Sequence, residues 1–450
     1  MKVLLLKPCW PYPISRKEST YNRMWPPLSL AYSAALLEQA GMEVKIFDAH
    51  AQRVSGRRLA SHLRGFDKIF ITSSDLDRWL CPNLDLTPVL EAAVLARGFT
   101  QELYLMGQHG TVQPEQLLAF TGARAVIRGE PEQTVLDLCR ADQLDQVSGI
   151  TFQTERGICS TPGRPLASLE TLPIPAFHQL PLAKYHYELL GQHFMLLETS
   201  RGCPFHCTFC AKDVMYGHGF RRKSLGRVLE EVDLAVKRHG VRTIYFYDLE
   251  FLIHRPFIYQ LCEALRQRHY PLRWCCQSRV TDVDEPLLSR LRQAGCTLIH
   301  YGVESGSQRL LDASRKEITL DEAQRAVRLT RQHGIQSLCF FMVGLPNETP
   351  EETTATLEFA QKLKPTYVSF HLAAPHEELR PVPDGNGHLL AFPIQHPSFN
   401  PLLKRSIRRS FWRFYLRPGY VWGWLCSTPL KLLLHQVQFF LRYTLPLPWA

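Results

Sequence analysis

The chain has 450 residues, of which 45% are apolar and 21% charged, a composition that excludes a disordered protein and predicts two or three domains. The formal net charge is +10, but no acidic residue follows Asp384, and eight Lys and Arg residues lie beyond it. The positive charge therefore belongs mainly to the C-terminal tail, which argues against a nucleic-acid partner for the whole surface. No segment resembles a secretory signal, so we expect a cytoplasmic protein whose thirteen cysteines are reduced and available for metal binding or catalysis.

Residues 1–147 alternate short apolar strands with helical segments. Strands are expected at 2–8, 43–49, 68–74, 102–107 and 125–130, and helices at 27–41, 57–64, 85–97 and 132–139. Such alternation predicts an α/β domain with a doubly wound parallel sheet. Ligands of these sheets bind beyond the carboxyl ends of the strands, which here are the loops 8–27, 73–82 and 107–111.

The rest of the chain divides into three predicted segments. Residues 148–193 contain a short hairpin and a proline-rich stretch, and we interpret them as a linker. Residues 194–375 contain six further strand–helix units, which predict a partial (βα)6 barrel with its chemistry on the loops after the strands. Residues 376–450 form a C-terminal extension that is expected to be helical, basic and aromatic.

Three cysteines follow the first strand of the predicted barrel, in the segment RGCPFHCTFC. Cys203, Cys207 and Cys210 have the spacing C-x3-C-x2-C, and no fourth cysteine follows nearby. A structural zinc site needs four ligands, and His193, His206 or His218 would have to supply the fourth. An iron–sulfur cube held by three thiolates instead leaves one iron open to a small molecule. We favour the cube and expect His206 to be an ordinary loop residue.

This segment resembles the hallmark of the radical S-adenosylmethionine (SAM) superfamily, and three further segments match. WCCQSRV resembles the third barrel strand, HYGVESGS the fourth and FMVGLPNETPEET the fifth. The resemblance implies a [4Fe–4S] cluster held by the three cysteines, with SAM on its open iron as the source of a 5′-deoxyadenosyl radical. It also implies a flavodoxin- or ferredoxin-type electron donor. The residues that it assigns to SAM are Phe209, Glu304, Ser305, Gly344 and Leu345.

Two acidic residues at the end of the second barrel strand have two interpretations. Asp248 and Glu250 either contact SAM or substrate or cap a helix, and the sequence does not separate these roles. The remaining cysteines of the barrel lie in apolar patterns, where cysteine packs as a small hydrophobic residue.

The first domain resembles that of the cobalamin-binding branch of the superfamily, in the segments PPLSLAYSAALLEQAGMEVKIFDA, GQHGT and IRGEPEQTVLDL. The resemblance implies that cobalamin is a cofactor. It assigns Gly107, His109, Gly110, Gly129 and Glu130 to its site, and the position of Asp75 and Trp79 after the third strand adds them as candidates. DAHAQR departs from the cobalt-ligating pattern D-x-H-x-x-G, because Arg53 replaces the glycine, so we interpret His50 as an ordinary loop histidine.

The resemblance implies methyl transfer to an unactivated carbon of a small molecule. A radical cyclase or rearrangement enzyme of tetrapyrrole or hopanoid type is the alternative, and an RNA-modifying methylthiotransferase fits less well because its additional cysteines and all-β tail are missing. A non-catalytic metal module would require a fourth ligand that the sequence does not provide.

The tail segment RRSFWRFYLRPGYVWGWL combines aromatic side chains with arginines. This combination suits a helix at a membrane surface, but the same side chains would also suit an open edge of the barrel. We therefore expect a lipid-like substrate and peripheral contact with the inner face of the membrane, or packing of the tail on the barrel, or both.

Overall fold

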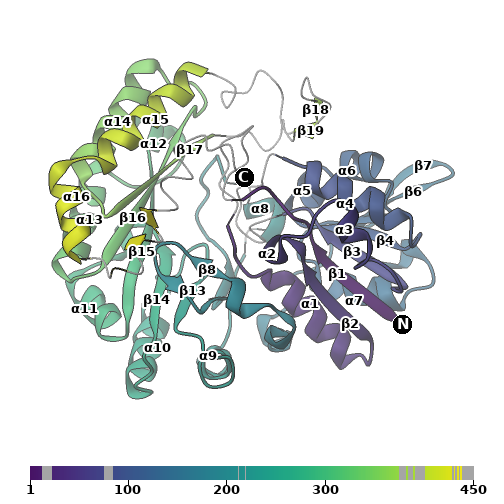
Figure 1. Cartoon of the computed structure of the whole chain (residues 1–450). Coiled ribbons are helices and arrows are strands. Elements are labelled where there is room, and N and C mark those ends of the chain that lie inside the picture. Colours follow the sequence, from purple (N-terminus) through teal and green to yellow (C-terminus); the bar gives the residue numbers. More distant parts are fainter. Residues whose placement is uncertain are drawn as a thin grey trace. The chain divides into compact units, whose positions relative to one another are not determined.

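The computed structural model describes residues 1–12, 23–74, 85–210, 212–217, 219–373, 382–383, 389–390, 401–427, 430, 433–434 and 436–437. The chain forms two compact units (Figure 1). Unit 1 comprises Met1–Tyr187, Ala211–Gly219 and His376–Pro393. Unit 2 comprises Glu188–Cys210, Phe220–Pro375 and Ile394–Ala450.

Unit 1 is built on a seven-stranded sheet with the strand order β2-β1-β3-β4-β5-β6-β7. The first five strands in sequence are parallel, and β6 and β7 are antiparallel additions at the β5 edge. The strands are β1 Lys2–Lys7, β2 Glu43–Asp48, β3 Lys68–Thr72, β4 Leu103–Met106, β5 Ala125–Ile127, β6 Ile150–Thr154 and β7 Gly157–Ser160. The predicted doubly wound parallel sheet is confirmed.

Helices cover both faces of this sheet. They are α1 Leu28–Gln39, α2 Ala49–Gln52, α3 Arg57–Ala60, α4 Thr87–Arg97, α5 Gln108–Val112, α6 Pro114–Thr121 and α7 Glu132–Arg140. Figure 1 shows α1 and α7 on one face, and α3, α4 and α6 on the other. Alternate residues of the strands, such as Leu4 and Leu6 in β1 and Ile69 and Ile71 in β3, enter the core under α3, α4 and α6. Unit 1 also contains the short elements β8 His186–Tyr187, α8 Lys212–Tyr216, β18 Val382–Pro383 and β19 Leu389–Leu390.

The hairpin β6–β7 belongs to unit 1, although its residues lie in the segment predicted as a linker. Residues Ala125 to Ile127 of β5 pair with residues Ile150 to Phe152 of β6, so the hairpin occupies the hydrogen-bonding edge that β5 would otherwise expose. The boundaries of the compact units therefore differ from those of the predicted segments 1–147, 148–193, 194–375 and 376–450. The predicted domain boundaries stay a prediction.

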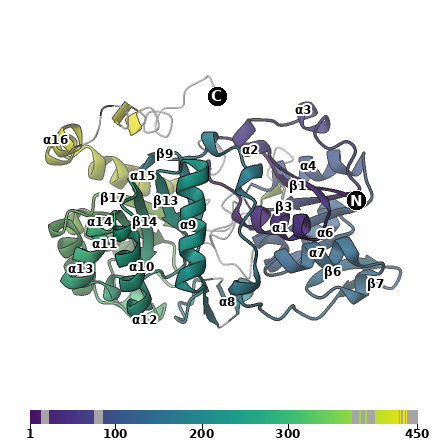
Figure 2. The same cartoon turned by 90° about the horizontal axis from the view of Figure 1, so that it is seen from below.

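Unit 2 is built on a six-stranded parallel sheet whose spatial order, β10-β13-β14-β15-β16-β17, follows the sequence. The strands are β10 Phe194–Leu197, β13 Thr243–Phe246, β14 Arg273–Ser278, β15 Cys296–Glu304, β16 Gln336–Val343 and β17 Tyr367–Leu372. The intervening helices are α9 Leu225–His239, α10 Arg255–Gln267, α11 Glu285–Gln293, α12 Gln308–Ala313, α13 Leu320–Gln332 and α14 Pro350–Leu363. Figures 1 and 2 show α10, α11, α13 and α14 along one side of the sheet. The predicted partial (βα)6 barrel is confirmed.

Local sequence fixes the starts and ends of these helices. Thr319 and Glu322 form a capping box at the start of α13, and Thr349 and Glu352 form another at the start of α14. Gly240 ends α9 in the left-handed conformation that glycine adopts without strain. These residues thus mark where α13 and α14 begin and where α9 ends. Unit 2 also contains β9 Gly191–Gln192 and the antiparallel pair β11 Ser200–Gly202 and β12 Phe220–Arg222.

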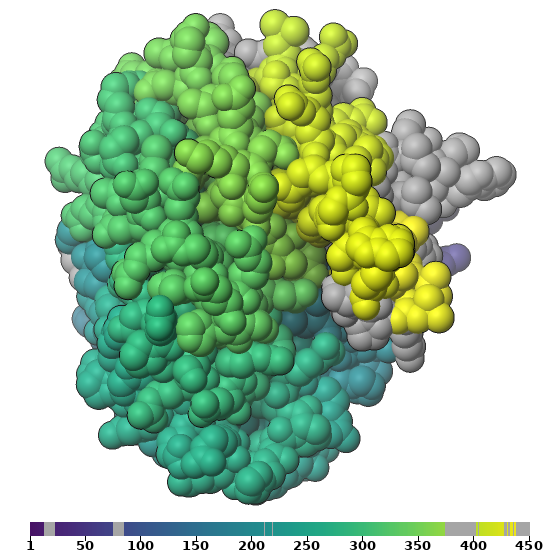
Figure 3. All heavy atoms as spheres, turned by 90° about the vertical axis from the view of Figure 1, so that its left-hand side faces the viewer, coloured from purple at the N-terminus to yellow at the C-terminus, as the bar shows by residue number. Residues whose placement is uncertain are grey.

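The C-terminal extension is helical over α15 Pro401–Tyr415 and α16 Pro418–Ser427. The Tyr415 hydroxyl lies 3.0 Å from both the backbone nitrogen and the backbone oxygen of Val368, in the edge strand β17. Phe414 is fully buried. In Figure 3 this extension runs across the surface of unit 2. Packing of the tail against the edge of the barrel is therefore observed.

Candidate active site

The three cysteines lie on a loop that leaves the carboxyl end of the first barrel strand. The loop follows β10 and β11, and each cysteine is half-buried. The Cys210 backbone N–H donates to the Cys207 carbonyl at 3.1 Å. The pKa of the Cys203 thiol is raised to about 12, mainly by burial and to a smaller extent by the nearby Glu250, Cys210 and Cys207. A bound metal would have to supply the positive charge that converts these thiols to thiolates.

Residues from two other loops hold the cysteine loop in place. The Thr208 N–H donates to the Ser314 carbonyl at 3.0 Å. The Arg279 guanidinium lies 3.7 Å from the centre of the Phe205 ring, and the Lys316 ammonium lies 5.8 Å from the centre of the Phe209 ring. The cysteine loop is therefore tied to the loop after β14 and to the segment between α12 and α13.

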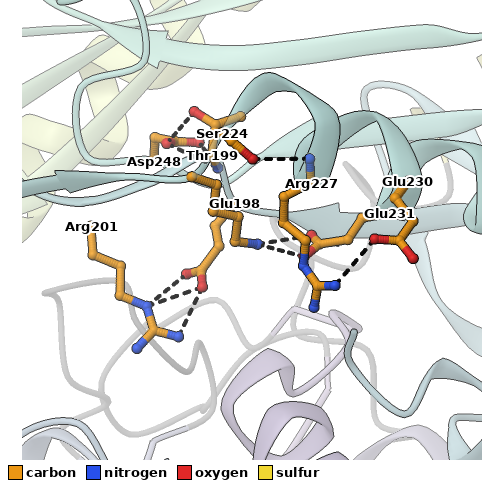
Figure 4. A network of polar contacts seen from close by, with 9 residues as sticks. Glu198, Thr199, Arg201, Ser224, Arg227, Glu230, Glu231 and Asp248 are labelled. Atoms are coloured by element: carbon orange, nitrogen blue, oxygen red, sulfur yellow. Dashed lines mark hydrogen bonds and ion pairs between the residues drawn. The ribbon is translucent and has the colours of Figure 1, made fainter. Parts of the chain in front are cut away.

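A buried polar network supports the start of the cysteine loop (Figure 4). Glu198 and Arg201 form a bidentate ion pair, with the closest N–O distance 2.8 Å, and each side chain is only 1% exposed. Asp248 accepts hydrogen bonds from the Thr199 N–H at 3.1 Å, the Thr199 hydroxyl at 2.8 Å and the Ser200 hydroxyl. Burial raises the pKa of Asp248 to about 6, although these donors oppose the shift. Asp248 thus anchors the backbone next to the cysteine loop.

Glu250 lies at the same end of the sheet and is equally buried. Its carboxylate accepts from the Ser278 hydroxyl at 2.7 Å and from the Arg279 N–H at 2.8 Å. The pKa of Glu250 is raised to about 8, mainly by burial and to a smaller extent by Asp282. Neither Asp248 nor Glu250 caps a helix with these contacts. Both connect the end of one strand to its neighbour.

The residues predicted to contact SAM come to the same end of the sheet, with different surroundings. Phe209 packs against an apolar cluster that contains Leu345 together with Leu310, Met342 and Ala373. The N–H of Leu345 donates to the Glu348 carboxylate at 2.8 Å, and the Gly344 N–H donates to the same oxygen. The cysteine loop and the loop after β16 therefore contribute to one apolar cluster, and the assignment of Phe209, Gly344 and Leu345 to SAM stays a prediction.

Glu304 and Ser305, the residues at the end of β15 that were predicted to contact SAM, have different environments. Glu304 forms a buried ion pair with Lys316 at 2.9 Å. Ser305 is fully buried, and its hydroxyl lies 3.1 Å from the Thr356 hydroxyl of α14. The Ser305 hydroxyl thus joins the turn after β15 to α14. The Glu304 carboxylate instead pairs with Lys316, whose ammonium faces the Phe209 ring. The assignments of both residues to SAM stay predictions.

In unit 1, the loops after β3, β4 and β5 bring the predicted cobalamin residues together. Gly107 has φ +105, and a Cβ there would lie 2.9 Å from the Ser73 hydroxyl and 3.0 Å from the Ser74 hydroxyl. His109 Nδ1 lies 3.0 Å from the Ser73 carbonyl. The Gly129 N–H donates to the Thr111 hydroxyl at 2.9 Å, which links the β4 and β5 loops.

The other candidates of unit 1 are placed as follows. A Cβ at Gly110 would lie 2.9 Å from the Val126 side chain, so close packing requires glycine there, and Glu130 is half-buried. Asp75 and Trp79 lie outside the described residues. His50 is fully buried on α2, with Nδ1 3.1 Å from the Trp10 carbonyl, in the environment of a structural histidine.

Sequence reasoning missed three charged residues of unit 2, namely Arg201, Arg279 and Lys316. Arg201 and Arg279 directly follow the ends of strands, a position that is itself a signal. Lys316 gives no such signal, because it lies in the charged run Arg315 to Glu317 and reads as a surface residue. Only the structure shows that it is buried.

The cysteines and the helices of the described part allow two further statements. The twelve described cysteines form no disulfide, and no three His, Cys, Asp or Glu residues of that part are arranged to hold a metal ion. In an iron–sulfur cube each thiolate binds its own iron, so the ligands of a cube do not meet at one point. As far as the helices are described, none combines the length and apolar character that a membrane-spanning helix requires.

Comparisons with known proteins agree with this architecture. The family model of the radical SAM superfamily matches residues 197–360. An uncharacterized methyltransferase of Pyrococcus horikoshii is 29% identical over 444 residues, which cover 93% of each chain. The anaerobic magnesium-protoporphyrin IX monomethyl ester cyclase of Rubrivivax gelatinosus is 30% identical over 371 residues, 78% of this chain and 64% of the relative.

A solved structure has the same fold across both units. The radical SAM methyltransferase TsrM of Kitasatospora setae, with cobalamin and a [4Fe–4S] cluster bound, superposes with a TM-score of 0.64 at 20% identity and covers 84% of this chain and 74% of its own. Residues 197–360 thus form a radical SAM domain, and the chain is an enzyme of that class. Its two units together have the fold of a cobalamin-dependent member.

Proposed function

We propose that the chain is a cobalamin-dependent radical SAM methyltransferase that acts on an unactivated carbon of a small molecule. The observation that carries this proposal is the C-x3-C-x2-C loop at the carboxyl end of the first strand of a parallel (βα)6 sheet, in a chain that also contains a second α/β unit. The methyltransferase relative matches nearly the whole chain, and TsrM has the same fold. These similarities favour methyl transfer among the reactions of the superfamily.

Cys203, Cys207 and Cys210 are the proposed ligands of a [4Fe–4S] cluster. They form no disulfide, are half-buried and are carried by one loop that neighbouring residues hold in place, as a cluster ligand set requires. When bound, the cluster, SAM and cobalamin would supply a one-electron reduction, a carbon-centred radical and a methyl donor. The apolar surface of Phe209 and Leu345 is suited to the face of an adenine ring, and Glu304, Ser305 and Gly344 complete the proposed SAM site.

The loops of unit 1 fit a large ligand that approaches the backbone closely. Gly107 and Gly110 let these loops pack closely, and a Cβ at Gly129 would meet nothing nearer than the Met215 carbonyl at 3.9 Å. His109 and Glu130 lie next to these glycines in the sequence. The Ser73 hydroxyl is buried and has no hydrogen-bond partner within the described part of the chain. A buried hydroxyl of this kind is suited to a polar group of a ligand. We propose these residues, with Asp75 and Trp79, as the cobalamin site.

Anaerobic reconstitution tests the proposal directly. The wild-type chain should bind iron and sulfide in equal amounts, bind cobalamin, and release 5′-deoxyadenosine and S-adenosylhomocysteine from SAM under reduction. Cys203→Ser should abolish both products because the cluster loses a ligand, whereas Cys426→Ser, an exposed cysteine of α16, should change neither. A wild-type protein that binds a cluster but forms neither product would overturn the proposal.

A radical cyclase is the second candidate, favoured by the 30% identity to the anaerobic cyclase of Rubrivivax gelatinosus. The same assay separates the two reactions. Methyl transfer releases S-adenosylhomocysteine in addition to 5′-deoxyadenosine, whereas ring closure releases 5′-deoxyadenosine alone.

We further propose a lipid-like substrate, peripheral contact with an anionic membrane through α16, and a flavodoxin- or ferredoxin-type electron donor. Trp422 is 72% exposed and Leu425 is 48% exposed on a segment of the chain that carries no acidic residue. Replacing both by Ser should lower binding to phosphatidylglycerol vesicles, while uncharged phosphatidylcholine vesicles serve as the control. Equal binding of the variant and the wild type to anionic vesicles would contradict the membrane contact.

A further inference from the structure

Unit 2 buries a lysine that neither the sequence motifs nor the proposed reaction uses. The Lys316 ammonium is 2.9 Å from a Glu304 carboxylate oxygen, and the two side chains are 9% and 10% exposed. The same ammonium lies 5.8 Å from the centre of the Phe209 ring, the residue directly before Cys210. A cation–π contact of this kind places a fixed positive charge against the cysteine loop.

The backbone around the pair is built to admit it. A Cβ at Gly302 would lie 2.5 Å from the Glu304 carboxylate and 2.7 Å from the Lys316 ammonium, so any larger residue would displace the pair. The pairing of β15 with β16 shifts register between Gly302 and Glu304. Glu304 itself has φ +69, a backbone conformation that is strained for a non-glycine residue. Strain of this kind persists where the surrounding contacts fix a side chain in one place.

The segment that carries Lys316 is also fixed. The Lys316 carbonyl accepts from the Arg279 guanidinium, which donates to the Glu317 carbonyl at 2.9 Å and stacks on Phe205. Phe205 and Phe209 both lie in the cysteine loop, so two cations contact that loop through its aromatic side chains.

The electrostatic surroundings keep the Lys316 amine charged. Burial alone would lower the pKa of Lys316, but the Glu304 carboxylate at 2.9 Å opposes this effect, and the pKa is raised.

We propose that the positive charge of Lys316 raises the reduction potential of the [4Fe–4S] cluster, and that the negative charge of Glu304 partly offsets this effect. This inference rests on the proposed cluster ligands. When a one-electron donor, dithionite in the test below, reduces the cluster, one negative charge is added beside Lys316, and a fixed positive charge stabilises the reduced state. Removal of the positive charge should therefore lower the potential, and removal of the Glu304 charge should raise it.

A redox titration of the reconstituted full-length chain without SAM tests this, with the reduced cluster measured by electron paramagnetic resonance. At a fixed poise, Lys316→Met should lower the ratio of reduced to oxidised cluster about tenfold, which is about 59 mV for a one-electron couple. Lys316→Arg should stay near the wild type, and Glu304→Gln should shift the ratio in the opposite direction to Lys316→Met. A residue with a merely structural role would not produce shifts of opposite sign.

The matched control is Lys68→Met in unit 1. Lys68 also pairs with a carboxylate, Glu102 at 2.9 Å. It lies at the amino end of β3, whereas the proposed cobalamin residues of unit 1 follow the carboxyl ends of the strands. Its replacement should leave the ratio unchanged. A Lys316→Met protein with an unchanged ratio, or a Lys68→Met protein with the same shift, would overturn the inference.

Two outcomes separate this inference from the proposed function. A wild-type chain that assembles no cluster would overturn the proposed ligands, whereas a cluster of unchanged potential in Lys316→Met would overturn only the role of Lys316. If Lys316→Met does not retain its cluster, Glu304→Gln decides alone. A ratio in that variant that is equal to or lower than the wild-type ratio would contradict the proposal.

Discussion

The two parallel sheets bury charge in different ways where their strands end. In unit 2, most buried charges are paired with opposite charges, as in Glu198–Arg201, Lys223–Glu231 and Glu304–Lys316. Breaking such a pair leaves one charge buried without compensation, which is costly. The loops around the cysteines are therefore held by groups that lose much of their stabilising effect when a single partner is changed.

At the ends of β1 and β2 in unit 1, the buried Lys7 and Asp48 have neutral partners instead. The Lys7 ammonium donates to the Trp25 carbonyl at 2.9 Å, and Asp48 accepts from the Tyr185 hydroxyl and the Ala51 N–H, each at 2.8 Å. A neutral amide can take over most of these contacts. The difference teaches that charge fixes the loops of unit 2, whereas hydroxyl groups and close glycine packing fix those of unit 1.

The largest expected effect comes from breaking an ion pair of unit 2. Glu198→Gln leaves the Arg201 guanidinium buried without a counter-charge and should lower the free energy of unfolding by about 3–5 kcal/mol. Asp48→Asn in unit 1 keeps an acceptor for Ala51 and should cost only about 1–3 kcal/mol. Denaturant unfolding of both variants measures the difference. An equal loss in the two variants would remove the distinction between the units.

Asp248 sharpens the comparison, because it is a buried acid of unit 2 with neutral donors. Its pKa is raised to about 6 in the folded state, above the ordinary value near 4. Its stabilising contribution is therefore complete below about pH 4 and is lost as the pH rises through about 6. Relative to Asp248→Asn, the wild type should lose about 1–3 kcal/mol of unfolding free energy between pH 4 and 7. A wild type that instead gained stability over this range would contradict the assignment.

Glycine packing in unit 1 is tested by Gly107→Ala. A Cβ there would meet the Ser73 and Ser74 hydroxyls, whereas Gly157, with the similar φ of +119, has nothing within 4 Å of a new Cβ. Both variants carry the backbone strain, so their difference isolates the clash, which should cost about 1–2 kcal/mol. Thermal unfolding of the pair gives this value, and equal transitions would show that the β3 and β4 loops tolerate the added methyl group.

The edges of the two sheets differ as well, and the smallest effect is expected there. The β5 edge of unit 1 is paired by the hairpin β6–β7, whereas the Tyr415 hydroxyl contacts the backbone of the edge strand β17 in unit 2. Tyr415→Phe should cost about 1–2 kcal/mol and speed hydrogen exchange at the Val368 amide. Tyr420→Phe is the control, since its hydroxyl makes no hydrogen bond within the described part of the chain. The tyrosine contact would be unimportant if both variants exchanged at the wild-type rate.

Much of this arrangement follows from local patterns. The sheets, the helix caps and the position of the cysteine loop after a strand were all predictable, because hydrophobic period, capping residues and short motifs act over a few residues. The hairpin β6–β7 was recognised as a hairpin, but its attachment to β5 was not, because edge pairing depends on residues that are distant in sequence.

The sequence by itself determined the superfamily, the two sheets and the three cysteines with their spacing. Only the tertiary structure decided what surrounds them. Lys316 is more than one hundred residues from Cys207, and the charged run around it is typical of a surface. Its burial against Glu304 and Phe209 arises when β15, the segment after α12 and the cysteine loop meet at one end of the sheet. A contact of this kind depends on the packing of distant segments, and no local pattern encodes it.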